Sequence, residues 1–119
     1  MSDANSEQCL FCRIVSGEVP ADVIARNDHA LGFRDISPVA PTHVLVIPLS
    51  HHANLAEVAA AEPETLVAMV GLAGQIAVAD GISQDGYRLV ANTGAAAHQT
   101  VFHAHLHVLG GRSMGWPPG

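Results

Sequence analysis

Three histidines that alternate with small or apolar residues constrain the fold of this chain more than any other feature. They are His103, His105 and His107. Side chains at alternate positions of a strand point to opposite faces, so a strand here places all three imidazole rings on one face. Neighbouring rings then lie roughly 6.6 Å apart along the strand, with His105 flanked on both sides. The pattern predicts a half-buried strand over residues 102–109.

Other segments predict the remaining elements. Apolar and β-branched runs bounded by turn residues indicate four more strands, over residues 23–26, 31–34, 43–47 and 87–92. Helical signals indicate a short helix over 9–16 with Gly17 as C-cap, a helix opened by Asn54 and Glu57, and a long helix over 63–79. The expected core face of the long helix consists of Leu66, Met69, Val70, Ala73, Ala77 and Val78. Because hairpins make the sheet antiparallel, the predicted class is α+β: an antiparallel sheet with a long helix and a short N-terminal helix.

Length and composition limit the classes of protein that the chain can be. Its 119 residues fit a single domain, expected over residues 9–119 with a C-terminal tail at 110–119, after a flexible N-terminus at 1–8. Hydrophobic residues make up 49% and charged residues 13%, which predicts a folded chain whose surface is partly covered in a homodimer. A net charge of −6 with five Lys and Arg residues argues against nucleic-acid binding.

Targeting and membrane signals do not appear in the sequence. The polar segment 1–8 lacks the apolar stretch of a signal peptide, and the apolar segment 66–79 is shorter than the roughly 20 residues of a membrane span. The two cysteines lie too close together to staple a secreted scaffold. We therefore expect a cytoplasmic location and no membrane partner.

Aligned imidazoles permit two kinds of chemistry. A neutral imidazole nitrogen attacks phosphorus well when its other nitrogen is held as a donor, and histidines with a pKa of about 6.5 can move protons around neutral pH. Alternating histidines on a strand can also chelate zinc. A third interpretation, in which the rings fill an interface without chemistry, is disfavoured because three in register stand beside a small polar loop at 93–101.

Four sequence motifs, one of which contains the three histidines, occur in order along the chain: FRDISP at 33–38, PTHVLVIP at 41–48, HAHLHVLGG at 103–111 and WPPG at 116–119. Together they resemble the histidine triad (HIT) superfamily, in particular its histidine triad nucleotide-binding (Hint) branch, from Cys9 to Gly119. The resemblance implies a HIT-like fold and a homodimer. It also implies hydrolysis of purine nucleoside 5′-phosphoramidates to an amine and a nucleoside monophosphate through a covalent nucleotidyl-histidine, with no cofactor required for catalysis.

The resemblance assigns roles to the histidines. It implies that His105 is the nucleophile and that His103 and His107 orient it and manage protons around the phosphate. His43 matches the fourth histidine of the family, which lies behind the triad.

The loop before the triad resembles the family's phosphate-binding loop. Gln99 and Thr100 are implied as donors to the phosphoryl oxygens through a side-chain amide, a catalytic hydroxyl and backbone amides. Asn92 corresponds to an asparagine at the phosphate or leaving group. Thr100 keeps the hydroxyl of the serine that is often found there, whereas His98 stands where glycine is common, which puts its phosphate contact in doubt.

The nucleoside is implied to bind elsewhere in the N-terminal half. Asp35 matches the acidic residue that accepts hydrogen bonds from both ribose hydroxyls. An apolar slot for the base is implied at Leu10, Phe11, Phe33 and Ile36. This slot favours a purine without choosing between adenine and guanine. The tail that carries Trp116 resembles one that reaches toward the partner subunit's active site.

A zinc site is implied by bacterial-type relatives. Its ligands here are Cys9, Cys12, His51 and His103, which form a closed structural set. The alternative is a pair of reduced core thiols, with His51 and His52 on a surface loop, and the residues alone leave both interpretations open. The C-x-x-C pair is not expected to be thioredoxin-like because the surrounding βαβ pattern is missing.

Three other functions remain as alternatives. One is a dinucleoside polyphosphate hydrolase or nucleotidyl transferase of the same superfamily. Another is a nucleotide-binding protein with little turnover. A metal-dependent hydrolase ranks lowest, since the implied chemistry needs no metal.

Overall fold

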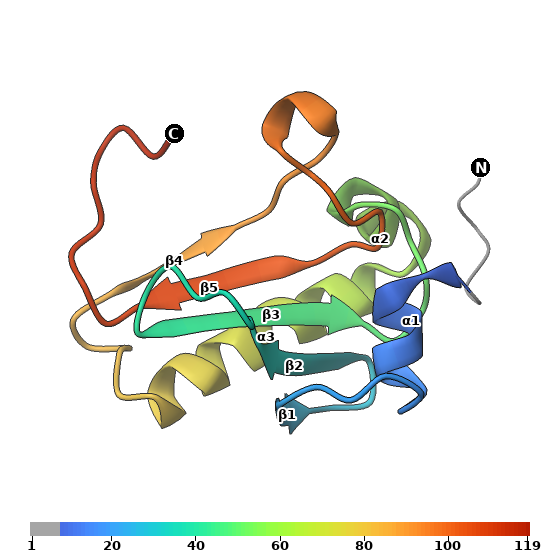
Figure 1. Cartoon of the computed structure of the whole chain (residues 1–119), viewed down its shortest axis with the longest axis horizontal. Coiled ribbons are helices and arrows are strands. Elements are labelled where there is room, and N and C mark those ends of the chain that lie inside the picture. The colour runs from blue at the N-terminus through green and yellow to red at the C-terminus, as the bar shows by residue number, and fades with distance from the viewer. Residues whose placement is uncertain (1–7) are drawn as a thin grey trace.

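Five strands form one antiparallel sheet in the computed structural model, which describes residues 8–119 (Figure 1). In chain order they are β1 Val23–Arg26, β2 Ala30–Arg34, β3 Thr42–Pro48, β4 Tyr87–Val90 and β5 Leu106–Gly110. Neighbours in the sheet follow the order β1-β2-β3-β5-β4, and each pair is antiparallel. The predicted sheet and α+β class are confirmed. The expected flexible N-terminus at 1–8 lies, apart from Gln8, outside the described residues.

The helices of this region are α1 Leu10–Val15, α2 Leu55–Ala61 and α3 Pro63–Ala79, with a 3-10 helix at Ala95–Ala97. The start of α2 confirms the predicted capping pair. The side chain of Asn54 accepts from the Glu57 N–H at 3.0 Å, and the Glu57 carboxylate accepts from the Ala53 N–H at 3.0 Å. Within residues 8–119, no helix has the combination of length and apolar character that a membrane crossing requires.

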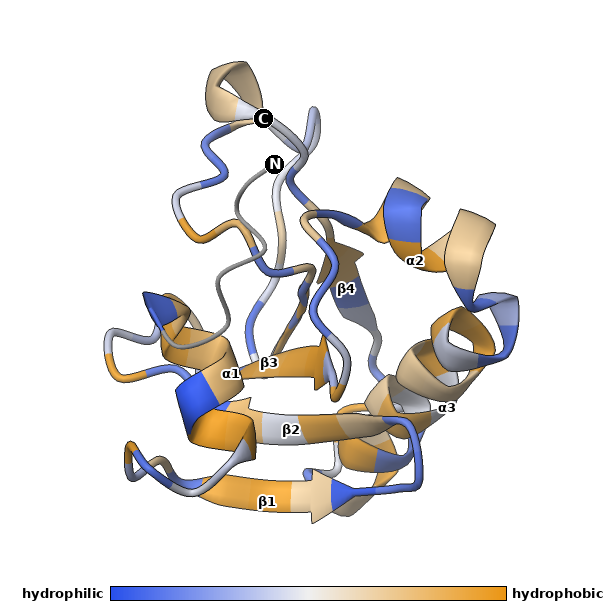
Figure 2. Ribbon diagram, turned by 90° about the vertical axis from the view of Figure 1, so that its right-hand side faces the viewer, coloured by the Kyte–Doolittle hydropathy of each residue, from blue (hydrophilic) through white to orange (hydrophobic). Residues whose placement is uncertain are grey.

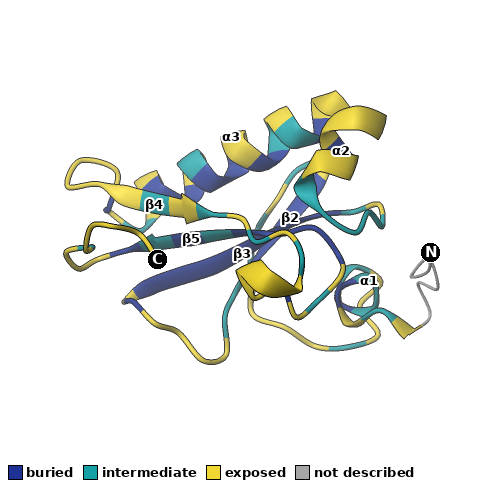
Figure 3. Ribbon diagram, turned by 90° about the horizontal axis from the view of Figure 1, so that it is seen from above, coloured by how far each residue is buried: buried dark blue, intermediate teal, exposed yellow. Residues whose placement is uncertain are grey.

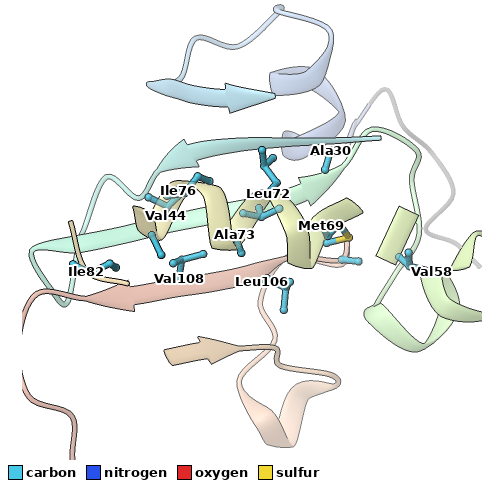
Figure 4. Packing of buried hydrophobic residues seen from close by; sticks show 13 residues of the cluster. Ala30, Val44, Val58, Met69, Leu72, Ala73, Ile76, Ile82, Leu106 and Val108 are labelled. Carbon is cyan, nitrogen blue, oxygen red and sulfur yellow. The ribbon is translucent and has the colours of Figure 1, made fainter. Parts of the chain in front are cut away.

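The sheet separates two cores, because alternate residues of each strand point to opposite faces. α3 covers one face and α1 lies on the other (Figures 2 and 3). On the α3 side the strands contribute Ala30, Val44, Val46, Leu106 and Val108 (Figure 4). On the α1 side they contribute Leu31, Phe33, Leu45 and Ile47. His43 and the triad rings therefore belong to the α1 side, where His103 and His105 meet the aromatic ring of Phe11.

Two of the residues expected on the core face of α3 are exposed. Val70 is 47% and Val78 is 66% exposed, whereas Leu72 and Ile76 are buried in their place. At 100° per residue, Leu72 and Ile76 lie close to the buried Met69 on the helix surface, and Val78 lies opposite it. The correction arises because this helix carries apolar residues on several sides, so its period alone does not select the buried face.

The strand predicted over 102–109 begins only at Leu106. In the β3–β5 ladder, Val46 pairs with Leu106. The next hydrogen-bonded pair along the ladder would join Pro48 to Ala104, but Pro48 has no N–H to donate. The Ala104 N–H donates instead to the carbonyl of His52, 2.7 Å away. His103 and His105 thus precede the strand, yet Ala104, Leu106 and Val108 are buried as the alternation predicts.

Candidate functional site

His105 presents one free ring nitrogen. Its Nδ1 lies 2.8 Å from the carbonyl oxygen of His103. A carbonyl only accepts, so Nδ1 carries the proton and Nε2 keeps its lone pair. Among residues 8–119, Nε2 has no hydrogen-bond partner, and it is not one of the fully buried unpaired atoms. The ring of Phe11 packs edge-on against His105 at 5.3 Å and limits its orientation. The arrangement leaves one ring nitrogen with a free lone pair in a fixed orientation, which is what nucleophilic attack requires.

A second series of contacts sets the proton positions of His43 and His107. The Val39 N–H donates to His43 Nδ1 at 3.1 Å, so His43 carries its proton on Nε2. That nitrogen lies 2.9 Å from His107 Nδ1, which must therefore accept. The proton of His107 is left on Nε2. This separation indicates a hydrogen bond between the rings. Asp35 lies beside them, and the three residues together also bring potential metal-ligating atoms close to one another.

Burial keeps this pair of rings neutral. Desolvation, aided by the charges of His105 and His43, lowers the pKa of His107 to about 4. Burial also lowers the pKa of His43, and the nearby Asp35 carboxylate opposes the shift. The 3.5 Å contact between His43 Nε2 and Asp35 Oδ2 is therefore not an ion pair near neutral pH. His107 acts in this state as a hydrogen-bond donor through Nε2.

His103 differs from the role expected for it. Its ring is fully buried, with Nε2 3.0 Å from the carbonyl of Pro48 and Nδ1 facing the sulfurs of Cys9 and Cys12 at 3.3 and 3.5 Å. The Pro48 carbonyl and the two sulfurs occupy both ring nitrogens, so the expectation that His103 moves protons at the phosphate is corrected. Its backbone carbonyl, by contrast, orients His105.

The predicted zinc ligands lie together. One ligand atom each from Cys9, Cys12, His51 and His103 falls within 4.8 Å of the others. Cys9 caps α1 by accepting from the Cys12 N–H, which brings both sulfurs to the same end of the helix. The Pro48 carbonyl holds the His103 proton on Nε2 and leaves Nδ1 as a ligand.

The distances within this cluster fit a tetrahedral ion. Cys12 Sγ lies 3.3 Å from His51 Nδ1, and the Cys9–His103 contact has the same length. Zn–S bonds of about 2.3 Å and Zn–N bonds of about 2.05 Å at a tetrahedral angle give S···N edges of about 3.6 Å. Burial and the neighbouring Cys9 thiol raise the pKa of the Cys12 thiol to about 12, so a bound cation is needed to hold it as a thiolate at neutral pH. His51 is half-buried and turns its Nδ1 toward the Cys12 sulfur, which favours the zinc interpretation over a pair of reduced thiols beside a surface loop.

In the loop before the triad, residues 93–101, the Gln99 groups expected to bind phosphate form internal hydrogen bonds instead. The buried Gln99 side chain accepts from the Gly94 N–H at 2.9 Å and donates to the carbonyls of Ala53 and Val101 at 2.7 and 3.0 Å. Its backbone N–H donates to the Gly94 carbonyl. Both expected phosphate donors of Gln99 are therefore occupied, which corrects its direct role: this residue braces the loop.

His98 adopts the left-handed conformation, with φ +67° and ψ +34°. Glycine reaches this region without strain, which gives a physical reason for glycine being common at this position in relatives. The His98 N–H donates to the Ala95 carbonyl, so it is not available to a phosphate.

Thr100 and Asn92 remain as polar groups next to the triad segment. Thr100 is exposed, and Asn92 is half-buried just beyond β4. Neither side chain makes a hydrogen bond to another described residue. The Thr100 hydroxyl and the Asn92 amide are therefore open to a ligand.

A largely apolar cavity of about 410 Å³ opens on the α1 side of the sheet. Phe11 lies between the cavity and His105, because its ring is 5.6 Å from that of Phe33 and 5.3 Å from that of His105. All five residues expected to contact the nucleoside line the cavity: Leu10, Phe11, Phe33, Asp35 and Ile36. The sequence interpretation missed other lining residues, namely Ile14, Val19, Pro20, Ala21, Asp22, Arg34 and Leu45. Helical spacing from Leu10 and strand alternation from His43 would have found Ile14 and Leu45, while Val19–Asp22 carries no periodic signal.

Two arginine side chains, Arg88 and Arg112, join the C-terminal tail to the rest of the chain. The Arg88 guanidinium donates to the Gly115 carbonyl at 2.8 Å. Trp116 is 83% exposed and does not reach the cavity of its own chain.

The chain is similar to known proteins along most of its length. The HIT domain family model matches residues 16–114. A protein of Escherichia coli strain K12 named purine nucleoside phosphoramidase is 42% identical over 110 residues, covering 92% of each chain. A HIT family hydrolase from Legionella pneumophila superposes with a TM-score of 0.90 at 48% identity, covering 94% of this chain and 100% of that one. A zinc-bound histidine triad family protein from Mycobacterium smegmatis gives a TM-score of 0.79 at 40% identity, with coverage of 97% and 82%.

Proposed function

The chain belongs to the HIT domain family, and from that membership we propose that it hydrolyses purine nucleoside 5′-phosphoramidates. The observation that carries the proposal is the free Nε2 of His105, whose ring is fixed as a donor on the carbonyl of His103 at 2.8 Å. The name of the Escherichia coli relative supports the choice of substrate.

The reaction takes two steps in this proposal. His105 Nε2 forms a bond to the α-phosphorus while the P–N bond breaks, and the amine leaves with a proton taken from solvent, which the attacking water returns in the second step. Water then attacks the phosphorus of the nucleotidyl-histidine, which releases the nucleoside monophosphate and returns the imidazole. The sum is one water consumed and one amine and one monophosphate formed.

The residues around His105 position the substrate. The apolar cavity takes the base, and the Asp35 carboxylate at its edge accepts from the ribose hydroxyls. Thr100 and Asn92 donate to the phosphoryl oxygens or the leaving group. His107 donates through Nε2 to charge that develops on phosphorus, with its proton held there by His43.

We propose further that Cys9, Cys12, His51 and His103 hold a structural zinc ion, as the cluster geometry and the zinc-bound relative support. A zinc ion here supplies a crosslink between α1, the segment after β3 and the triad. We expect about one zinc per chain by elemental analysis, and a lowered melting temperature in Cys12→Ser. A stoichiometry near zero in protein purified without chelator would contradict this proposal.

Intact-mass spectrometry tests the proposed function. Protein quenched during turnover of adenosine phosphoramidate should carry one nucleotidyl group, and peptide mapping should place it on His105. His105→Ala and His105→Gly should lose the adduct and the turnover while still binding adenosine monophosphate. His29→Ala, an exposed histidine away from the cavity, is the matched control and should keep both.

A parallel assay separates the alternatives within the family. Diadenosine polyphosphate offered under the same conditions should turn over much more slowly than the phosphoramidate. Faster turnover of the dinucleotide favours the polyphosphate hydrolase, and tight monophosphate binding with no turnover of either favours a nucleotide-binding protein.

A further inference from the structure

Arg112 makes a contact that neither the nucleophile nor the nucleotide cavity explains. It follows β5 directly, and its Nε–H donates to the backbone carbonyl of Val39 at 3.0 Å. Its Nη1 donates to the carbonyl of Ser113 at 3.0 Å. Val39 lies 73 positions earlier, in the loop between β2 and β3. The guanidinium therefore ties the segment after β5 to that loop.

Gly111 lets the segment before Arg112 approach the β2–β3 loop closely. Gly111 has φ +90°, and a Cβ built there would lie 2.8 Å from the Cβ of Pro41, closer than such atoms approach in proteins. Only glycine lets the two segments pass at this distance. Arg112 is thereby brought alongside the β2–β3 loop, within reach of Val39.

The backbone N–H of Val39 contacts the pair formed by His43 and His107. This N–H donates to His43 Nδ1 at 3.1 Å, and His43 Nε2 lies 2.9 Å from His107 Nδ1. These contacts form a continuous series from Arg112 to the ring of His107. Among the residues that the structure describes, no other hydrogen bond holds Val39.

We propose that Arg112 is a positioning residue that sets the proton positions of His43 and His107. By holding the carbonyl of Val39, it keeps the Val39 N–H on His43 Nδ1. His43 then carries its proton on Nε2 and donates to His107 Nδ1, so the proton of His107 itself stays on Nε2. The kinetic consequence of this inference rests on the proposed function, whereas its structural consequence does not.

Loss of the tether changes what His107 offers. When the Val39 N–H moves away, His43 Nδ1 is free to take the proton in place of Nε2. His43 then accepts from His107 Nδ1 instead of donating to it, and His107 turns a lone pair toward the phosphoryl oxygens. A hydrogen-bond donor is replaced by an acceptor at the position where negative charge develops.

Ring-nitrogen correlation spectra of nitrogen-labelled protein test the inference, because they distinguish Nδ1–H from Nε2–H. The unaltered chain should show single Nε2–H forms for His43 and His107, and Arg112→Met should show mixtures of both forms. With a nucleoside phosphoramidate, kcat of Arg112→Met should fall about tenfold, as for residues that orient a catalytic ligand, while KM changes by less than about twofold. Arg112→Lys keeps a donor and should retain the single forms.

Arg88→Met is the matched control. It removes the other guanidinium that binds a backbone carbonyl of the C-terminal segment, at Gly115, but it has no contact with Val39. Its His43 and His107 should keep the forms of the unaltered chain. Unchanged spectra in Arg112→Met, or the same mixture in Arg88→Met, would overturn the inference. If the proposed function is wrong, no variant turns over the phosphoramidate, yet the spectra still decide the role of Arg112.

Discussion

At the scale of single residues, His107 shows how burial controls both charge and stability. Desolvation first, and then the neighbouring rings of His105 and His43, lower its pKa from 6.5 to about 4. The unfolded chain binds this proton near pH 6.5, whereas the folded chain binds it only near pH 4. Folding is therefore unaffected by this group at neutral pH and loses stability as the pH falls from 6.5 to about 4.

Urea unfolding of the unaltered chain and of His107→Gln measures this effect. The difference in unfolding free energy between the two should shift in favour of His107→Gln by roughly 2 kcal/mol between neutral pH and pH 4, a figure reduced to allow for the partial exposure of the ring. Groups far from His107 titrate equally in both proteins and cancel, so the difference reports His107 together with the rings coupled to it. A difference that stays constant with pH contradicts the assigned burial of His107.

Single residues also show where sequence reasoning ends. The alternation at 103–107 predicts that the three rings share one side of the chain, and the contacts of Phe11 with His103 and His105 and of His105 with His107 agree with it. The proton on each ring depends instead on groups that are distant in sequence, such as the Pro48 carbonyl for His103. The amide of Gln99 has the chemistry of a phosphate donor, and only the positions of Ala53 and Val101 show that it is occupied.

At the scale of elements, the loop between β4 and β5 depends on the buried Gln99. Gln99→Glu keeps the shape of the side chain but places an oxygen against the carbonyls of Ala53 and Val101. We expect a loss of about 2 kcal/mol in unfolding free energy because buried acceptors lose their donors. We also expect lower kcat, because Thr100 and the triad lie directly after the loop.

Gln84→Glu makes the same chemical change at an exposed turn residue and is the control. Chemical denaturation and phosphoramidate turnover should be unchanged in that variant. Equal losses in Gln84→Glu and Gln99→Glu would show that added charge, and not the loop contacts, is responsible.

Most helices and strands can be predicted where nearby residues, such as caps, turns and apolar runs, determine their ends. The hairpin strands, the capped α2 and the span of α3 agree with their predicted positions within a residue or two. β5 starts late because Pro48 of the neighbouring strand has no N–H to donate. Pro48 is distant in sequence, so the residues around 102–109 give no sign of this. The exposed sides of α3 were missed because an apolar helix surface does not mark which side the sheet will cover.

At the scale of the whole molecule, the two edges of the sheet differ. β1 carries a register irregularity between Val23 and Ala25, which protects an edge from pairing. β4, at the other edge, is regularly paired with β5 and exposes Tyr87 and Leu89 (Figure 1). We propose that a second copy of the chain covers the β4 edge, which accords with the low charge content of the sequence.

Light scattering with size exclusion tests this assembly. The unaltered chain should elute with twice the 12.4 kDa mass of one copy. Leu89→Lys should shift the mass toward a single copy, because a charge on the edge opposes strand pairing. Val23→Lys places the same charge on the β1 edge and should leave the dimer intact. A mass of one copy for the unaltered chain contradicts the proposal.

His103 joins two parts of the molecule through a single residue. Its ring lies among the sulfurs of Cys9 and Cys12, while its carbonyl is the oxygen on which His105 is aligned. An oxidant that reaches the sulfurs therefore misaligns the attacking nitrogen without touching it. We therefore expect peroxide treatment of the thiols to lower turnover before it lowers the folded fraction, which activity and circular dichroism measured in parallel would check.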